Sequence, residues 1–175
     1  TPFVSLVAVL SLALGIGANS AIFSLFDQIL MQPLPVPAPH ELVNLSAPGP
    51  KPGSTQCNQS GACEDTFSYP MFRDLERVQD SLVGIAAHRI ISTNLAYNGQ
   101  TESARGVLVS GSYFPVLGLT PAAGRLFTPD DDRTPGTSYL AVLSHDYWRR
   151  RFQEDPGVVG QSLIVNGHAF TIIGV

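Results

Sequence analysis

The sequence predicts an α+β domain of short strands and short helices, preceded by one membrane-spanning helix. Three observations support this prediction. No charged residue precedes Asp27, so the net charge of −4 comes entirely from the rest of the chain. The 14 prolines and 16 glycines among 175 residues indicate many turns. Beyond the apolar segment, short alternating runs are separated by Asn-Gly turns and by serines that can cap helices. The negative net charge also argues against nucleic acid as a partner.

The apolar segment Phe3–Phe26 is 24 residues long, which as a helix spans about 36 Å against a hydrocarbon core of roughly 30 Å. Thirteen of its residues are Leu, Ile, Val or Phe, each favouring insertion by about 0.3–0.6 kcal/mol near a helix centre. A buried core helix of this length would be unusual without a charge. A cleaved signal peptide is the stronger alternative, because Ala18-Asn19-Ser20 resembles a cleavage site, although the apolar run continues past it. We therefore expect residues 1–31 to form a transmembrane helix and its exit, held in a lipid bilayer.

Small residues recur along one face of this helix. Ala13, Gly17, Ala21 and Ser24 follow one another at spacings of four, four and three. Such a face lets another helix approach closely, and Asn19 adds an amide that prefers a partner to lipid. The alternative is that the small residues simply tolerate lipid. We expect the face to pack on further transmembrane helices of the same protein or on a second copy.

The segment after the helix, residues 32–47, is rich in proline. Pro33, Pro35 and Pro37 alternate with other residues, which favours a stiff, extended exit from the membrane. Glu41–Ser46 then alternates polar and apolar residues and predicts a strand. No lysine or arginine occurs between Asp27 and Lys51, which favours a non-cytoplasmic side for this flank.

Residues 48–65 form a predicted loop that contains both cysteines. Cys57 and Cys63 could close a seven-residue ring in an oxidising compartment. Two free thiols, or a metal pair lacking its other ligands, are the competing interpretations. A disulfide here would agree with the non-cytoplasmic side predicted for the flank.

Residues 66–175 predict the α+β domain itself. The first expected elements are a helix capped by Ser68 and ending near Val78, and a hairpin of Leu82–Tyr97 and Glu102–Val109 around Asn98-Gly99. A short helix over Ser110–Leu117, ended by Gly118, a turn-rich segment Pro121–Gly136 and a strand Tyr139–Leu143 follow. The last expected elements are a helix capped by Ser144 and ending near Phe152, and a hairpin of Gln161–Val165 and Ala169–Val175 around Asn166-Gly167.

Motifs for nucleotide binding and metalloprotease catalysis are absent from the sequence. Lys51 is the one lysine and lies in Gly-Pro-Lys-Pro, so no Walker A loop exists in these residues. His40-Glu41 lacks the second histidine of the zinc-protease pattern. The other histidines, His88, His145 and His168, fall on a strand, a helix start and a turn, where surface or structural roles are expected. We expect no catalytic, cofactor or metal site in this sequence.

Two charged runs have structural explanations. Asp130-Asp131-Asp132 lacks the alternating ligands and closing glutamate of a calcium loop, so a solvated turn or helix start is expected. Arg149-Arg150-Arg151 covers one helical turn beside Trp148 and points in several directions. We expect a solvated helix face there, with one arginine packing on the tryptophan or pairing with an acid, rather than an anion site.

Several segments together resemble one family. Those segments are Ala13–Phe23 followed by Pro33-Leu34-Pro35, then Val109–Gly118 with Pro121–Phe127, then Val142–Phe152 with Asp155–Gly160, and finally Asn166-Gly167 and Ile172–Val175. The sequence is similar to the MacB/FtsX-like ABC transporter permeases, most of all to the large duplicated bacterial type. It departs from many relatives at Gln32 and Val36 around the Pro-Leu-Pro segment and in its cysteine loop, which resembles a local insertion.

This resemblance implies a MacB-like periplasmic core domain, truncated at its C-terminus, on a permease of the bacterial inner membrane. It implies a subunit without catalysis of its own, working with a separate cytoplasmic ATPase whose motion reaches the extracytoplasmic domain through the membrane helices. Export and mechanical signalling are both compatible with it. The Pro33, Pro35 and Pro37 exit is then the expected coupling element, because a flexible linker would dissipate motion. A single-span anchored binding or sensor domain without an ATPase, and a secreted enzyme, are the competing classes.

Overall fold

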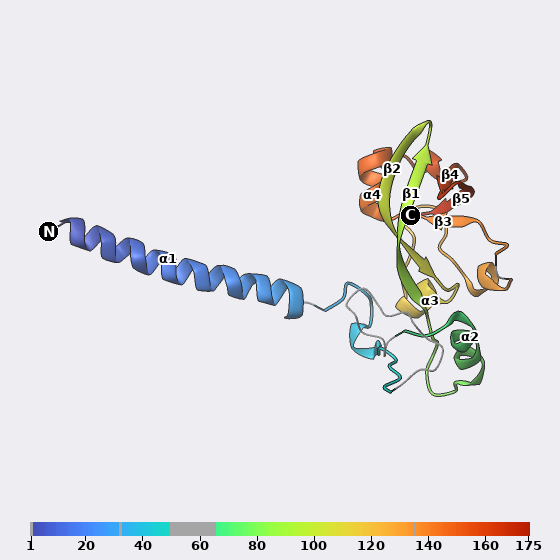
Figure 1. The fold of residues 1–175 in the computed structure, drawn as a ribbon, viewed down its shortest axis with the longest axis horizontal. Coiled ribbons are helices and arrows are strands. Elements are labelled where there is room, and N and C mark those ends of the chain that lie inside the picture. The colour runs from blue at the N-terminus through green and yellow to red at the C-terminus, as the bar shows by residue number, and fades with distance from the viewer. Residues whose placement is uncertain (1, 32, 50–65, 135) are drawn as a thin grey trace. The chain divides into compact units, whose positions relative to one another are not determined.

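The chain divides into two units, one ending at Pro35 and the other beginning at Val36. The computed structural model describes residues 2–31, 33–49, 66–134 and 136–175 (Figure 1). The first unit holds α1 (Pro2–Phe26), followed by one π-helical turn, Asp27–Met31. α1 contains 25 residues, none of them charged and none buried. The helix predicted from the sequence is thus present as one continuous helix, long and apolar enough to cross a membrane.

The second unit contains a five-stranded mixed sheet with short helices, which confirms the predicted α+β class. Its helices are α2 (Tyr69–Val78), α3 (Tyr113–Leu117) and α4 (His145–Phe152), with short 3-10 turns at Pro39–Glu41, Pro129–Asp132 and Pro156–Val158. Its strands are β1 (His88–Tyr97), β2 (Gln100–Val109), β3 (Leu140–Val142), β4 (Ser162–Val165) and β5 (His168–Gly174). The strand order is β2-β1-β4-β5-β3, with all pairs antiparallel except β3 and β5.

Both predicted hairpins form at Asn-Gly turns. β1 and β2 pair without interruption from His88 opposite Val109 to Tyr97 opposite Gln100. Asn98 and Asn166 have φ angles of 49°, and each is followed by a glycine that also has a positive φ. Two consecutive residues with positive φ are the requirement of the tight turn that matches strand twist, and Asn-Gly meets it at low cost.

The predicted caps also form. The Ser68 side chain accepts a hydrogen bond from the Met71 amide at the start of α2, and the Ser144 side chain accepts one from the Tyr147 amide at the start of α4. Gly118 ends α3 in the left-handed conformation, with a φ of 65°. Each cap satisfies backbone groups that the first or last turn of a helix leaves without an intrahelical partner.

The main core lies where α4 packs on the sheet. Trp148 of α4 is buried with Leu163 of β4 and Ile172 of β5, and Ile172 has no exposed surface. Trp148 donates its indole N–H to the carbonyl oxygen of Asp155 at 2.7 Å, so its single polar atom is satisfied in the interior. Phe152 extends this core toward the hairpin by an edge-on contact with Tyr97.

Three local predictions were wrong. Glu41–Ser46 is not a strand, because Glu41 ends a 3-10 turn and the following residues find no sheet edge, leaving Val43 64% and Leu45 40% exposed. The first strand of the hairpin begins at His88 rather than Leu82. The exit is not straight, since the chain bends across Pro35–Pro37. Proline fixes φ but leaves ψ free, so alternating prolines alone do not impose one direction.

Candidate functional site

The small-residue face of α1 is open along its length. Ala13, Gly17, Ala21 and Ser24 are all exposed, and a Cβ added at Gly17 would meet no atom within 4 Å. At about 100° per residue these four positions fall within about 80° of one another around the helix axis. They therefore form one stripe on which a second helix could lie closely.

Asn19 does not lie on that stripe. It follows Gly17 by two positions, which turns its side chain by about 200° around the helix. One partner helix packed on the small-residue stripe would leave the Asn19 amide facing elsewhere. If both features are used, α1 lies between two partners, because a buried amide in lipid needs a hydrogen-bonding group of its own.

The exit contains the boundary between the two units. Pro33 and Pro35 close the first unit, and Pro37 belongs to the second. Pro37 lies against the end of α3, since a Cβ placed on Gly118 would be 3.4 Å from the Pro37 Cγ. The last predicted coupling residue thus contacts the sheet domain directly. Cys57, Cys63 and Lys51 lie outside the described residues.

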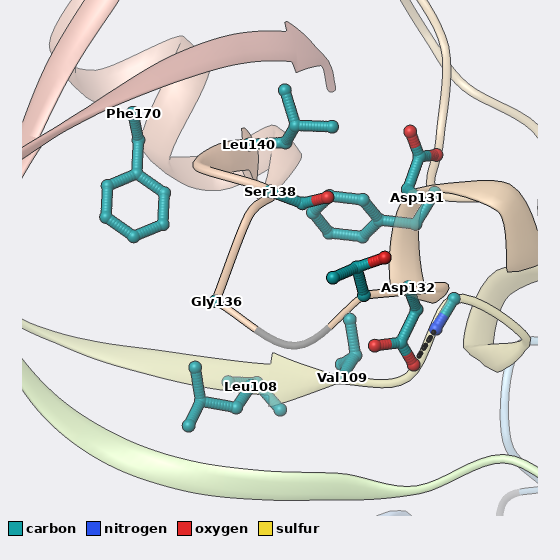
Figure 2. A pocket seen from close by; sticks show the side chains of 12 residues that line it. Leu108, Val109, Asp131, Asp132, Gly136, Ser138, Leu140 and Phe170 are labelled. Carbon is teal, nitrogen blue, oxygen red and sulfur yellow. Dashed lines mark hydrogen bonds between the residues drawn. The ribbon is translucent and has the colours of Figure 1, made fainter.

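A pocket of about 190 Å³ lies where the two edge strands of the sheet approach each other (Figure 2). Its apolar wall comes from the end of β2, from Phe127, from Leu140 of β3 and from Phe170 of β5. β2 and β3 are opposite edges of the sheet, so the sheet curls to bring both to one cavity. The lining residues include no histidine, cysteine, lysine or arginine, and the pocket therefore holds none of the usual nucleophile and base pairs.

The two carboxylates at the pocket already have partners. Asp132 accepts hydrogen bonds from the Tyr69 hydroxyl at 3.0 Å and from the Gly111 amide at 3.2 Å, the second drawn in Figure 2. Burial and this bond to Asp132 raise the pKa of Tyr69. A Cβ on Gly111 would collide with the Thr128 carbonyl oxygen, so only glycine permits this close approach. Asp132 therefore joins α2, the turn after β2 and the 3-10 turn Pro129–Asp132.

The other carboxylate at the pocket, Asp131, pairs with an arginine. Arg125 binds it through two nitrogens at 2.7 and 2.9 Å, and the backbone amide of Thr128 donates to it at 2.9 Å. The Arg125 hydrogen bonds and those from Thr128 lower the pKa of Asp131 to about 2, against the opposing effect of burial. The acidic run begins a short 3-10 helix, as the sequence predicts. Its capping box and its pairs with Arg125 and Arg133 are additional findings. Among the described residues no group of His, Cys, Asp or Glu could hold a metal ion.

The arginine run is held by acids on both sides. Arg149 pairs with Asp146 at 3.0 Å within α4, and Arg151 lies 3.7 Å from Glu102 of β2. Tyr147 also donates to Glu102, at 2.6 Å, and its pKa rises to about 12 because of burial and then this carboxylate. The predicted pairing with an acid is confirmed. The connection to β2 depends on a glutamate 45 residues from Tyr147, which no local pattern identifies.

The histidines take surface positions among aromatic rings. His145 lies edge-on to Trp148 at 5.7 Å between ring centroids, and His168 stacks on Tyr139 at 5.9 Å. His88 lies 5.9 Å from Tyr113 in a tilted arrangement. The three lie on different elements, β1, α4 and β5, and among the described residues none belongs to a group that could hold a metal ion.

These features define a chain with one helix long and apolar enough to cross a membrane, followed by a mixed α/β domain. The model of the MacB-like periplasmic core domain family matches residues 5–175, from within α1 to Val175, the residue after β5. The chain belongs to this family. The resemblance to this family that the sequence predicts is thus confirmed.

Two curated relatives show how far the similarity extends. The chain is 30% identical over 106 residues to the macrolide export ATP-binding/permease protein MacB of Shigella dysenteriae serotype 1 (strain Sd197) and to the protein of the same name from Escherichia coli (strain K12). Each match covers 59% of this chain and 16% of the relative. The chain thus spans less than a fifth of the length of these relatives.

Solved structures share the fold. The periplasmic region of MacB from Actinobacillus actinomycetemcomitans superposes with a TM-score of 0.52 at 25% identity, covering 59% of this chain and 47% of that one. The extracellular domain of the noncanonic ABC-type transporter YknZ from Gram-positive bacteria gives a TM-score of 0.52 at 20% identity, covering 62% of this chain and 56% of that one. The second likeness shows the fold alone.

Proposed function

We propose that the chain is a non-catalytic permease part that couples ATP hydrolysis by a separate cytoplasmic ATPase to movement of its extracytoplasmic domain. The observation that supports this most is the unbroken family match from residue 5 to residue 175, which includes α1 and the sheet domain together. A membrane helix joined to a domain without a catalytic arrangement among its described residues suits the transmission of motion. Export of a substrate and mechanical signalling to a partner are the two outcomes of such motion.

The proposed location is the bacterial inner membrane, with the sheet domain on the periplasmic or extracellular side. The flank after α1 carries Asp27 and no lysine or arginine before Lys51, and basic residues favour the cytoplasmic side. The similar structures are described as a periplasmic region and an extracellular domain. The remaining transmembrane helices of the same permease, or a second copy, are the proposed partners of the small-residue stripe.

The coupling element in this proposal is the segment Pro33–Pro37. It joins α1 to Pro37, which lies against the capped end of α3. Three prolines restrict φ at every second position, so the segment changes its shape less readily than a glycine linker. Movement of α1 would therefore reach the sheet domain instead of being absorbed between the two units.

The test uses the full-length permease purified with its ATPase and reconstituted in a bilayer. Replacing Pro33, Pro35 and Pro37 by glycine should preserve ATP hydrolysis and abolish the ATP-driven fluorescence change of a dye attached at Gln100. Pro39→Gly, a change within the second unit, is the matched control and should leave the response intact. An unchanged response in the triple variant would contradict the coupling role. A full-length protein with no further transmembrane helix and no ATPase would instead favour the single-span sensor.

A further inference from the structure

Apolar side chains project from one end of the sheet domain. In the segment that ends α2 and leads toward β1, Val78 is 72% exposed, Leu82 is 37% exposed and Val83 is fully exposed. The loop is held in shape by local bonds, since the Leu82 amide donates to the Gln79 side chain and Ser81 donates to Asp80. Val78 and Val83 thus leave most of their apolar surface in water, and Leu82 leaves part of it, which raises the free energy of the domain.

This loop and the chain's entry into the domain both lie against the C-terminal end of α3. A Cβ on Gly84 would be 2.9 Å from Val116, so the residue after Val83 packs directly on α3. Two positions further on, Gly118 contacts Pro37, the second residue of the domain. In Figure 1, α2 and the segment that begins at Val36 lie toward one end of the sheet domain, and the turn between β1 and β2 lies at the other.

Chain connectivity keeps that end close to the bilayer. α1 alone spans about 37 Å at 1.5 Å per residue, close to the roughly 40–45 Å of hydrocarbon core plus headgroups. Val36 follows Met31 by five residues, each of which spans at most about 3.5 Å, so it lies within about 18 Å of the end of the helical segment. This limit holds for any orientation of the domain.

We propose that the loop tip Val78–Val83 rests on the lipid surface beside α1, with Leu82 and Val83 immersed among the headgroups. Three aliphatic side chains without an aromatic anchor are fewer than a stable protein interface uses. A lipid surface requires only shallow immersion, on the order of 5–10 Å. The contact would fix which end of the domain faces the membrane. It requires α1 to span the bilayer and is independent of the coupling to an ATPase.

The test is depth-dependent quenching in the chain of residues 1–175, reconstituted in phosphatidylcholine vesicles with bromine on the upper part of the acyl chains. Trp148 is the one tryptophan and lies in the core, so the unmodified chain gives the background. Val83→Trp places a reporter at the proposed contact without disturbing packing. Gln100→Trp is the matched control at the other end of the domain, and Leu14→Trp reports insertion of α1.

Brominated lipid should lower the added fluorescence of the Val83→Trp chain roughly twofold or more, because the reporter lies within the shallow immersion depth. The Gln100→Trp signal should not change, and the Leu14→Trp signal should be strongly quenched. If Leu14→Trp is quenched and Val83→Trp is not, the docking proposal is wrong while the permease assignment stands. Equal quenching at positions 83 and 100 would also overturn it, because the contact would then not belong to this end. An unquenched Leu14→Trp would remove the membrane span on which the docking depends.

Discussion

α1 and the sheet domain differ in whether their apolar side chains are buried. None of the 25 residues of α1 is buried, although the helix carries no charge. In the sheet domain, Trp148, Leu163 and Ile172 are buried together beneath α4. The domain thus makes a core from its own residues, whereas the helix needs lipid or other helices to cover it. Substitutions in the two units should therefore change different measurable properties.

The largest expected effect is on the core. Ile172→Ala removes a side chain with no exposed surface and should lower the free energy of unfolding of the domain by about 2–5 kcal/mol. Leu14→Ala, at the middle of α1, should leave that free energy unchanged because Leu14 packs on nothing in its unit. Urea unfolding in detergent, followed by Trp148 fluorescence, measures both. Equal destabilisation by the two variants would mean that the units share a core.

The second effect concerns charge within the domain and its pH dependence. Asp131→Asn should cost about 1–2 kcal/mol at pH 7, a range reduced because Arg125 is 50% exposed to solvent. The pKa of Asp131 is lowered from 3.8 to about 2, so its ionised form stabilises the folded state. That contribution is complete above about pH 4 and is lost as the pH falls through about 2. Denaturant unfolding of the wild type and of Asp131→Asn at several pH values should show the difference in their free energies of unfolding shrinking in this window. A difference that does not change with pH would contradict the role given to the Arg125–Asp131 pair.

The third effect belongs to α1. Gly17→Leu should weaken association with the other membrane helices of the full-length permease by about 1 kcal/mol, or roughly fivefold, because the leucine fills the small-residue stripe. Gly15→Leu is the matched control, since Gly15 lies about 200° from Gly17 around the helix. Crosslinking yield in native membranes compares the two. Equal loss in both variants would show that bulk, and not the stripe, is what matters.

The smallest effect is at the contact between α4 and β2. Tyr147→Phe removes one hydrogen bond to Glu102 and should lower the free energy of unfolding by about 0.5–1 kcal/mol. Since the pKa of Tyr147 is raised to about 12, the wild-type advantage is complete below about pH 10 and is lost as the pH rises through 12. Unfolding at pH 7 and pH 11 measures it. A larger effect at pH 11 than at pH 7 would contradict this assignment.

The sequence predicts features formed by neighbouring residues and misses pairings between segments that are far apart in the chain. The caps at Ser68 and Ser144 and the two Asn-Gly turns follow from residues within a few positions of each other, and all form. The parallel pairing of β3 with β5 depends on chain segments far apart and was not predicted. Glu41–Ser46 has the alternation of a strand but no neighbour to pair with, so pattern alone misleads there.

The contacts around the candidate site were missed for the same reason. Tyr69 and Asp132 are 63 residues apart in the chain, and the 3-10 turn brings Asp132 within hydrogen-bonding distance of both Tyr69 in α2 and the Gly111 amide after β2. Gly111, just before α3, was the signal available in the sequence. A glycine there suggests that another segment approaches closely, but it does not identify that segment. The open stripe on α1, by contrast, follows directly from helical spacing.

The most direct measurement is alkaline extraction of membranes from cells that produce the unmodified chain, with its N-terminus sequenced afterwards. A chain anchored by α1 stays in the membrane pellet, unprocessed, and is released only by detergent. Recovery of the uncleaved chain in the aqueous supernatant without detergent would contradict the membrane span. A new N-terminus near Ala21 on a released domain would identify α1 as a signal peptide instead.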